Sequence, residues 1–153
     1  MSKKYKEQYE RVKRWYQRLK NITDGKKHNF PSEYYQDEVL AFLINCYHLK
    51  DWIINDVTEG VSRKEVEDFV RQSEFIKVCG DICNGSKHLT ITTPKSDKNT
   101  RLGGRNFFLE LGAIIPVFRA KYKIISGSKE YDAFFLATKC LDHWDRFIKD
   151  RKL

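Results

Sequence analysis

The sequence predicts a mainly α-helical protein: a four-helix bundle with a small β hairpin or sheet inserted between the third and fourth helices. Apolar side chains recur at intervals of three and four residues along most of the chain, which places them on one face of a helix. Between about residues 89 and 126 the spacing changes to alternation with β-branched residues, which is typical of strands. A chain of 153 residues can form one core, so residues 1–153 are expected to be a single helical domain.

A basic first helix is expected over residues 3–22, and Asp24-Gly25 ends it. Its apolar positions are spaced by four, three, four and three residues, while Lys and Arg occupy the other faces. We therefore assign its aromatic side chains to the core rather than to stacking on bases. The apolar positions are Tyr5, Tyr9, Val12, Tyr16 and Leu19.

Two further helices are expected before the β insertion. The second begins at Ser32, an N-cap residue, and runs to about Val57, where Gly60 stops it. The third begins at the capping box Ser62-Arg63-Lys64-Glu65. It is expected to end at Asn84-Gly85, because Gly adopts the left-handed conformation at little cost.

The β-containing insertion is expected over about residues 89–126. Leu89–Thr93 is predicted to be a strand ended by Pro94, and Val117–Ile125 a second strand. The polar residues 95–106 between them are predicted to be an exposed loop. The apolar stretch 107–115 fits either a strand or a helix.

A turn and a last helix follow the insertion. Ser126–Lys129 is rich in Ser and Gly and is expected to turn the chain. The last helix is predicted from about Glu130 to Lys149, with cations at its end, where they suit the helix dipole.

The net charge of +8 is concentrated near the N-terminus. Residues 1–27 hold ten Lys and Arg against three Asp and Glu, whereas the rest of the chain holds nineteen against eighteen. A basic surface attracts RNA or another polyanion by releasing counterions, although a solvated helix face that favours solubility explains the same residues. The candidate nucleic-acid contacts are Lys13, Arg14 and Lys20 of the first helix and Lys98, Arg101 and Arg105 of the polar loop.

Composition also limits the location and the cofactors. No apolar run reaches the roughly 18 residues that span a membrane, and the basic N-terminus continues into charged residues rather than into a secretory signal. The four cysteines lack the Cys-x2-Cys spacing of a zinc site, although such a site can be assembled across helices. Small buried thiols are the simpler interpretation. We therefore expect a cytoplasmic protein with reduced cysteines, no metal, no cofactor and no membrane partner.

The first candidate for chemistry lies at the predicted end of the third helix. His88 can transfer a proton near neutral pH, Lys87 can stabilise developing negative charge, and Asn84 can orient either one. In the structural alternative, Asn84-Gly85 caps the helix, and Lys87 and His88 interact with its last carbonyl groups.

The second candidate is a polar stripe on the second helix. Asn45, His48, Asp51 and Asn55 are spaced by three or four residues, so they share one helix face. A histidine beside a carboxylate is either a tuned base or an ordinary helix pair. His48 and Asp51 are candidate supporting residues if this face meets His88.

Three segments of the chain stand out together. They are His48-Leu49-Lys50-Asp51-Trp52, then Asn84-Gly85-Ser86-Lys87-His88, then Tyr131-Asp132-Ala133 with Leu136-Ala137, Cys140, Trp144 and Phe147. In this combination the chain resembles small uncharacterised bacterial proteins that look like HEPN-type helical bundles. The resemblance covers about residues 33–149, and its most specific part is the second segment.

Many HEPN domains are metal-independent ribonucleases of toxin–antitoxin, abortive-infection and CRISPR-linked defence systems. They usually dimerise, so that two Arg-x4-6-His motifs form one cleft. In this chain no arginine stands four to six residues before His88, and Lys87 offers a point charge in place of the bidentate guanidinium group. HEPN members without the motif commonly serve as binding or antitoxin-side modules.

The resemblance implies a HEPN-like, homodimeric protein of a bacterial defence or mobile-element system that contacts RNA. Metal-independent RNA cleavage is one activity it implies, with His88 as acid or base and Lys87 and Asn84 on the phosphate side. The alternative is a non-catalytic, antitoxin-like interaction module. Such a module would bind a partner protein of the same locus, or nucleic acid, through the basic first helix.

Overall fold

The computed structural model describes the chain apart from residues 1–2, 26–29, 57–59, 89–91, 98 and 111–116, and describes the backbone alone at 107–110 and 117–118. The described residues form five helices and one three-stranded antiparallel sheet, so the mainly helical prediction is confirmed. The elements are α1 (Tyr5–Thr23), α2 (Ser32–Asp56), α3 (Arg63–Gln72), α4 (Glu74–His88), β1 (Arg101–Glu110), β2 (Val117–Ser126), β3 (Lys129–Asp132) and α5 (Ala133–Asp150).

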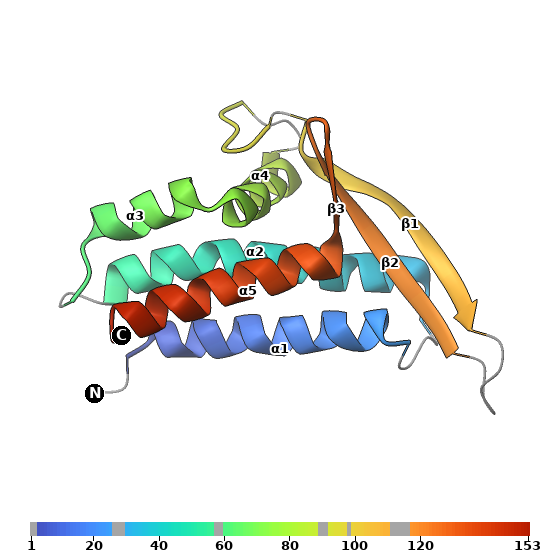
Figure 1. Ribbon diagram of the computed structural model, residues 1–153, viewed down its shortest axis with the longest axis horizontal. Coiled ribbons are helices and arrows are strands. Elements are labelled where there is room, and N and C mark those ends of the chain that lie inside the picture. Colours follow the sequence, from blue (N-terminus) through green and yellow to red (C-terminus); the bar gives the residue numbers. More distant parts are fainter. Residues whose placement is uncertain (1–2, 26–29, 57–59, 89–91, 98, 111–116) are drawn as a thin grey trace.

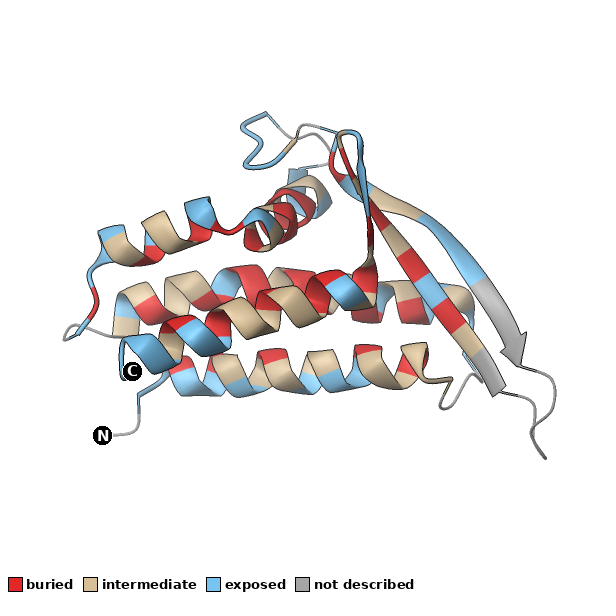
Figure 2. Ribbon diagram, viewed as in Figure 1, coloured by how far each residue is buried: buried red, intermediate tan, exposed pale blue. Residues whose placement is uncertain are grey.

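Helix α2 lies at the centre of the helical part. Helices α1, α4 and α5 pack against it, and α1 lies on the opposite side of α2 and α5 from α3 and α4 (Figure 1). Figure 2 shows buried positions around much of α2, which is the reason that its apolar residues do not keep to one stripe. The sheet stands at one end of the helices (Figure 1).

Two polar contacts fix the neighbours of α2. Gln8 of α1 is buried, and its Nε2 donates to the carbonyl oxygen of Asn45 at 3.0 Å. The indole Nε1 of the fully buried Trp144 donates to the carbonyl oxygen of Cys46 at 3.2 Å. Because buried N–H groups cost free energy when they are unpaired, these contacts set how α1 and α5 seat on α2.

The prediction of a single third helix is wrong, because the helix is interrupted at Ser73 and forms α3 and α4 instead. Ser73 has an extended backbone, and its buried hydroxyl accepts a hydrogen bond from the N–H of Ile76 at 3.2 Å. The same oxygen is hydrogen-bonded to Nδ1 of His143 on α5 at 2.8 Å. The capping box expected at Ser62 is present. Local caps at both ends therefore make α3 a separate helix.

The expected helix stop at Asn84-Gly85 is also wrong. Helix α4 continues through both residues to His88, and Gly85 is absent from the described glycines with positive φ. Ser86 donates to the carbonyl oxygen of Cys83 at 2.9 Å, as helical residues often do. A glycine within a helix costs only about 1 kcal/mol relative to Ala, so packing against α2 outweighs its preference for a turn.

The β insertion differs from its prediction at both ends. The first three residues of the expected strand 89–93 lie outside the described residues, and Thr92 and Thr93 form bends instead of a strand. The expected loop 95–106 is wrong from Arg101 onward, because this part is paired with β2. The register of β1 against β2 shifts between Leu102 and Arg105, at the two glycines, so the strand is irregular there. Its polar residues resemble those of a loop, which is why the sequence pattern did not indicate a strand.

The turn and the last helix come close to the prediction. Gly127 turns the chain with a φ of 61°, and β3 then pairs with β2 where the start of the last helix was predicted. The helix begins at Ala133, after Asp132 accepts a hydrogen bond from the N–H of Phe135 at 2.9 Å. None of the helices in the described part of the chain is long and apolar enough to cross a membrane.

The burial of His143 makes the stability depend on pH. Burial, together with the positive charge of Arg146, lowers the pKa of His143 below its usual 6.5. The unfolded chain therefore takes up this proton at a higher pH than the folded chain. The contribution of neutral His143 to the free energy of unfolding is complete above about pH 6.5. It declines as the pH falls toward the lower pKa of the folded state.

We expect His143→Gln to weaken the decline of the unfolding free energy between pH 7 and pH 5, measured by urea denaturation. Gln does not titrate, so the difference in bound protons at this position disappears. His88→Gln, at the exposed end of α4, is the control and should leave the decline in place. An unchanged decline in His143→Gln would contradict the assignment.

Candidate functional site

The carboxylate of Asp81 joins α4 to the segment that precedes the sheet. Asp81 is fully buried, and its oxygens accept hydrogen bonds from the backbone N–H groups of Lys95 (2.6 Å), Ser96 (2.6 Å) and Asp97 (3.1 Å). The hydroxyl of Ser96 also donates to it. A buried carboxylate requires such donors, so residues 95–97 are held against α4.

The anchored segment places Lys95 over α4 and beside Tyr47 of α2. The Nζ atom of Lys95 lies 5.8 Å from the centre of the Tyr47 ring, and that of Lys50 lies 5.0 Å from it. Gly80 makes this close approach possible. A Cβ at this position would lie 2.7 Å from the Tyr47 ring and 2.8 Å from Cδ of Lys95.

A pocket of about 460 Å³ opens at this point between α2, α3, α4 and the anchored segment. Four of its lining residues are cationic and one is acidic. We call it the basic pocket; its lining is Tyr47, Lys50, Glu67, Val70, Arg71, Lys77, Pro94 and Lys95. Its volume lies within the range of sites for small ligands or single nucleotides.

The cations of the basic pocket differ in their pairing. Lys50 is paired with Asp51 at 2.5 Å, and Arg71 is paired with Asp68. Among the residues that the structure describes, neither Lys77 nor Lys95 has an ion-pair partner. These two side chains therefore keep positive charge available for a bound anion.

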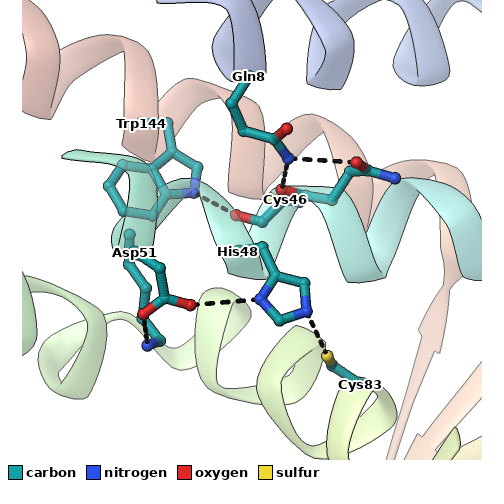
Figure 3. A network of polar contacts seen from close by, with 8 residues as sticks. Gln8, Cys46, His48, Asp51, Cys83 and Trp144 are labelled. Atoms are coloured by element: carbon teal, nitrogen blue, oxygen red, sulfur yellow. Dashed lines mark hydrogen bonds and ion pairs between the residues drawn. The ribbon is translucent and has the colours of Figure 1, made fainter. Parts of the chain in front are cut away.

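A seam of polar side chains, His48, Asp51 and Cys83, lies between α2 and α4 (Figure 3). Lys50 joins it to the pocket, because this residue lines the pocket and pairs with Asp51. Nδ1 of His48 lies 3.2 Å from Oδ2 of Asp51, and Nε2 of His48 lies 3.5 Å from Sγ of Cys83. Burial opposes ionisation of Asp51, but hydrogen bonds from Lys50 and His48 outweigh burial and lower its pKa. Asp51 therefore links the pocket to this seam as a carboxylate.

The thiol of Cys83 lies at one end of the seam, next to His48 (Figure 3). Burial raises its pKa, and the negative charge of Asp51 acts in the same direction, while Lys50 and Lys87 oppose them. The thiol is therefore unsuited to act as a nucleophile near neutral pH.

The structure brings together only part of the predicted catalytic set. His48 contacts Asp51 and Cys83, and the charge of Lys87 acts on Cys83, whereas His88 is exposed at the last residue of α4. Within the described residues His88 takes part in no hydrogen bond or ion pair. Asn84 is half-buried on the same helix.

The predicted nucleic-acid contacts on α1 lie away from the basic pocket. Lys13 is paired with Glu10 and Lys20 with Asp24 at 2.5 Å, while Arg14 is exposed. Pairing with neighbouring acids reduces the positive charge that this helix presents. The basic first helix is thus packed against the helical core, and four of its cations, Arg11, Lys13, Arg18 and Lys20, are paired with acidic residues.

The predicted contacts in the loop are also distributed differently. Lys98 lies outside the described residues, and Arg101 and Arg105 are exposed on β1. Arg101 donates to the carbonyl oxygen of Asn99 at 3.2 Å.

Sequence reasoning missed most of the basic pocket. Tyr47 has the helical spacing of a core residue, so the sequence does not mark it as part of a site. Lys77 and Arg71 are single cations within helices, which is common on helix surfaces. The detectable signal was Asp81, an acidic residue among apolar neighbours on a helix face. A buried acid needs donors, and the polar stretch after Pro94 supplies them.

Comparison with known proteins finds no match: no family model fits the chain, and no curated protein or solved structure resembles it significantly. The HEPN-type resemblance therefore stays a hypothesis that rests on the quoted residues.

We expect Asp81→Asn to lower the free energy of unfolding by about 2–4 kcal/mol, measured by urea denaturation, because one of the two acceptor oxygens is replaced by a donor facing N–H groups. Asp132→Asn is the matched control. It should cost little, because Asn caps a helix as well as Asp. Equal effects of the two substitutions would contradict the anchoring role of Asp81.

Proposed function

We propose that the protein binds RNA and that the basic pocket holds a backbone phosphate. The observation that carries this proposal is the convergence of Lys50, Arg71, Lys77 and Lys95 on one concave site. These side chains come from three helices and from the segment that Asp81 anchors, so their spacing is fixed by the fold. Arg and Lys are the residues that most often contact phosphate oxygens.

The seam extends this site along α2 and α4. Lys50 belongs to the pocket and also pairs with Asp51, which contacts His48. An RNA strand that leaves the pocket along this face would meet His48 and then Lys87. A single strand suits a pocket of this size better than a duplex does, because only splayed nucleotides enter a concave site.

The HEPN-type resemblance supplies a context for this proposal: an RNA-contacting protein of a bacterial defence or mobile-element system, acting as a homodimer. The alternative is a non-catalytic module that holds a partner protein or nucleic acid through α1. Cations of both surfaces pair with neighbouring acids. The basic pocket is favoured over α1 as the RNA contact because its four cations converge on one concave site.

We expect the double variant Lys77→Gln/Lys95→Gln to bind single-stranded RNA at least tenfold more weakly than the wild type, measured by fluorescence anisotropy at several salt concentrations. Each lost phosphate contact lowers the slope of log K against log salt by about 0.7, so the two substitutions should lower it by about 1.4.

The matched control is Lys13→Gln/Arg14→Gln, which removes the same charge from α1. It should change affinity and salt slope much less. Equal losses in the two double variants would assign binding to overall charge. A larger loss in the α1 variant would favour the alternative module and contradict the pocket.

RNA cleavage is a second candidate function, and the hydrogen bond between His48 and Asp51 favours it. A carboxylate that holds one imidazole nitrogen leaves the other to exchange protons, although here that nitrogen faces Cys83. The proposed roles are His88 as acid or base, Lys87 and Asn84 beside the phosphate, and His48 with Asp51 in support.

We expect the wild type to cleave a pool of end-labelled RNA in the presence of EDTA if the protein is a metal-independent nuclease. His88→Ala should then lower the rate by about 100-fold or more while RNA binding stays unchanged. His48→Ala, assayed beside it, shows which histidine exchanges the proton. Absence of cleavage by the wild type, with RNA binding intact, would contradict catalysis and leave the binding function.

A further inference from the structure

Three cysteines from three different helices meet in the core. They are Cys46 of α2, Cys79 of α4 and Cys140 of α5, and each has no exposed surface. Their Sγ atoms all lie within 4.8 Å of one another, and those of Cys79 and Cys140 are 3.3 Å apart. We call this group the sulfur cluster. Residues 46, 79 and 140 are far apart in the sequence, so only the packing of the bundle assembles it.

The spacing of the sulfur atoms suits three bonds to one central atom. A separation of 3.3 Å is well beyond the roughly 2.05 Å of a disulfide, so these are separate thiols. If a central atom lies about 2.3 Å from each of three sulfurs in one plane, the sulfurs are about 4 Å from one another. In a pyramidal arrangement the sulfurs lie somewhat closer together. Small shifts of side chains would bring the cluster to either arrangement.

The cluster offers three sulfur ligands without a fourth. Cys83 lies one turn after Cys79, but its Sγ is directed to Nε2 of His48 at 3.5 Å (Figure 3). The indole N–H of Trp144 is used by the carbonyl oxygen of Cys46. Among the described residues the group within bonding reach therefore consists of three sulfurs, whereas structural zinc takes four ligands.

The net charge of the complex distinguishes further between the ions that three thiolates could bind. Three thiolates around a divalent ion leave one negative charge, and around a monovalent ion they leave two. Leu49, Leu136 and Ala137 of the same helices are fully buried in this core, where a net charge is costly. A trivalent, thiophilic centre that takes three ligands gives a neutral product.

We propose that the sulfur cluster binds one trivalent arsenic atom as a neutral complex of three thiolates. Arsenous acid, As(OH)₃, is itself uncharged near neutral pH, so entry into the core buries no charge. Each of the three thiols loses its proton to a departing hydroxyl group. Three As–S bonds replace three As–O bonds, three molecules of water leave, and the oxidation state of arsenic does not change.

The environment of Cys46 favours it for the first bond. Hydrogen bonds from the thiols of Cys140 and Cys79 outweigh burial and lower the pKa of Cys46. The thiolate is the form that attacks and ligates. Burial and the contact with Cys46 raise the pKa of Cys140, and they also raise the pKa of Cys79, where the hydrogen bond with Cys140 opposes them. These two thiols supply their protons as the later bonds form.

The test is the mass of the intact native protein after incubation with arsenite, which counts the bonds directly. Three As–S bonds add one arsenic atom and remove three hydrogens, whereas a two-sulfur adduct keeps one hydroxyl group on arsenic. We expect a single adduct of the first kind, together with a rise in the melting temperature, because ligand bound only by the folded chain stabilises it.

Variants separate the cluster from Cys83. Cys83→Ala should keep the three-sulfur adduct, and Cys140→Ala should lose it; circular dichroism of both variants checks that they fold. Because the wild-type mass already counts the bonds, the test does not depend on the folding of Cys140→Ala. An adduct that keeps a hydroxyl group, no adduct at all, or displacement of arsenic by equimolar Zn²⁺ would overturn the proposal.

Discussion

The buried carboxylate of Asp81 is the interaction on which the arrangement outside the helical core depends. Its charge is tolerable in the interior because the backbone N–H groups of residues 95–97 donate to it. The hydroxyl of Ser96 is also hydrogen-bonded to the hydroxyl groups of Thr100 and of Ser126, and Ser126 is the last residue of β2. One acidic residue thereby attaches the sheet to α4 and holds Lys95 over the ring of Tyr47.

Helix α2 places two different environments next to each other in the sequence. Cys46 faces the sulfur cluster in the core, while Tyr47 lines the basic pocket, because successive residues of a helix point about 100° apart. The same rotation brings His48 to the seam with α4. Anion binding and thiol chemistry are therefore proposed for separate faces of one helix, and a ligand at either site would act on the packing of α2 against α4.

The sequence predicted the parts of the fold that depend on local patterns. Helical spacing located α1, α2 and α5, and the capping box located the start of α3. The break at Ser73 has a local part, the cap that its hydroxyl gives to the N–H of Ile76, and a distant part, the hydrogen bond to His143 seventy residues later. The apolar spacing continues across Ser73, so it shows neither part. Asn84-Gly85 carries a strong local stop signal, and packing of α4 on α2 outweighs it. For the site, His48, Asp51 and Lys87 were identified from their residue types. Tyr47 and Lys77 are brought together by the packing of α2 and α4, and Lys95 joins them through the anchor at Asp81.

The most direct measurement is a titration of the ¹⁵N-labelled protein with a short single-stranded RNA, followed by amide NMR spectra. Binding at the basic pocket should shift the amide signals of Tyr47, Lys77 and residues 95–97, with α1 nearly unaffected. In Asp81→Asn the same signals should respond more weakly, because Lys95 is no longer held in place. Shifts confined to α1, or a response without saturation spread over the whole surface, would contradict RNA binding at this pocket.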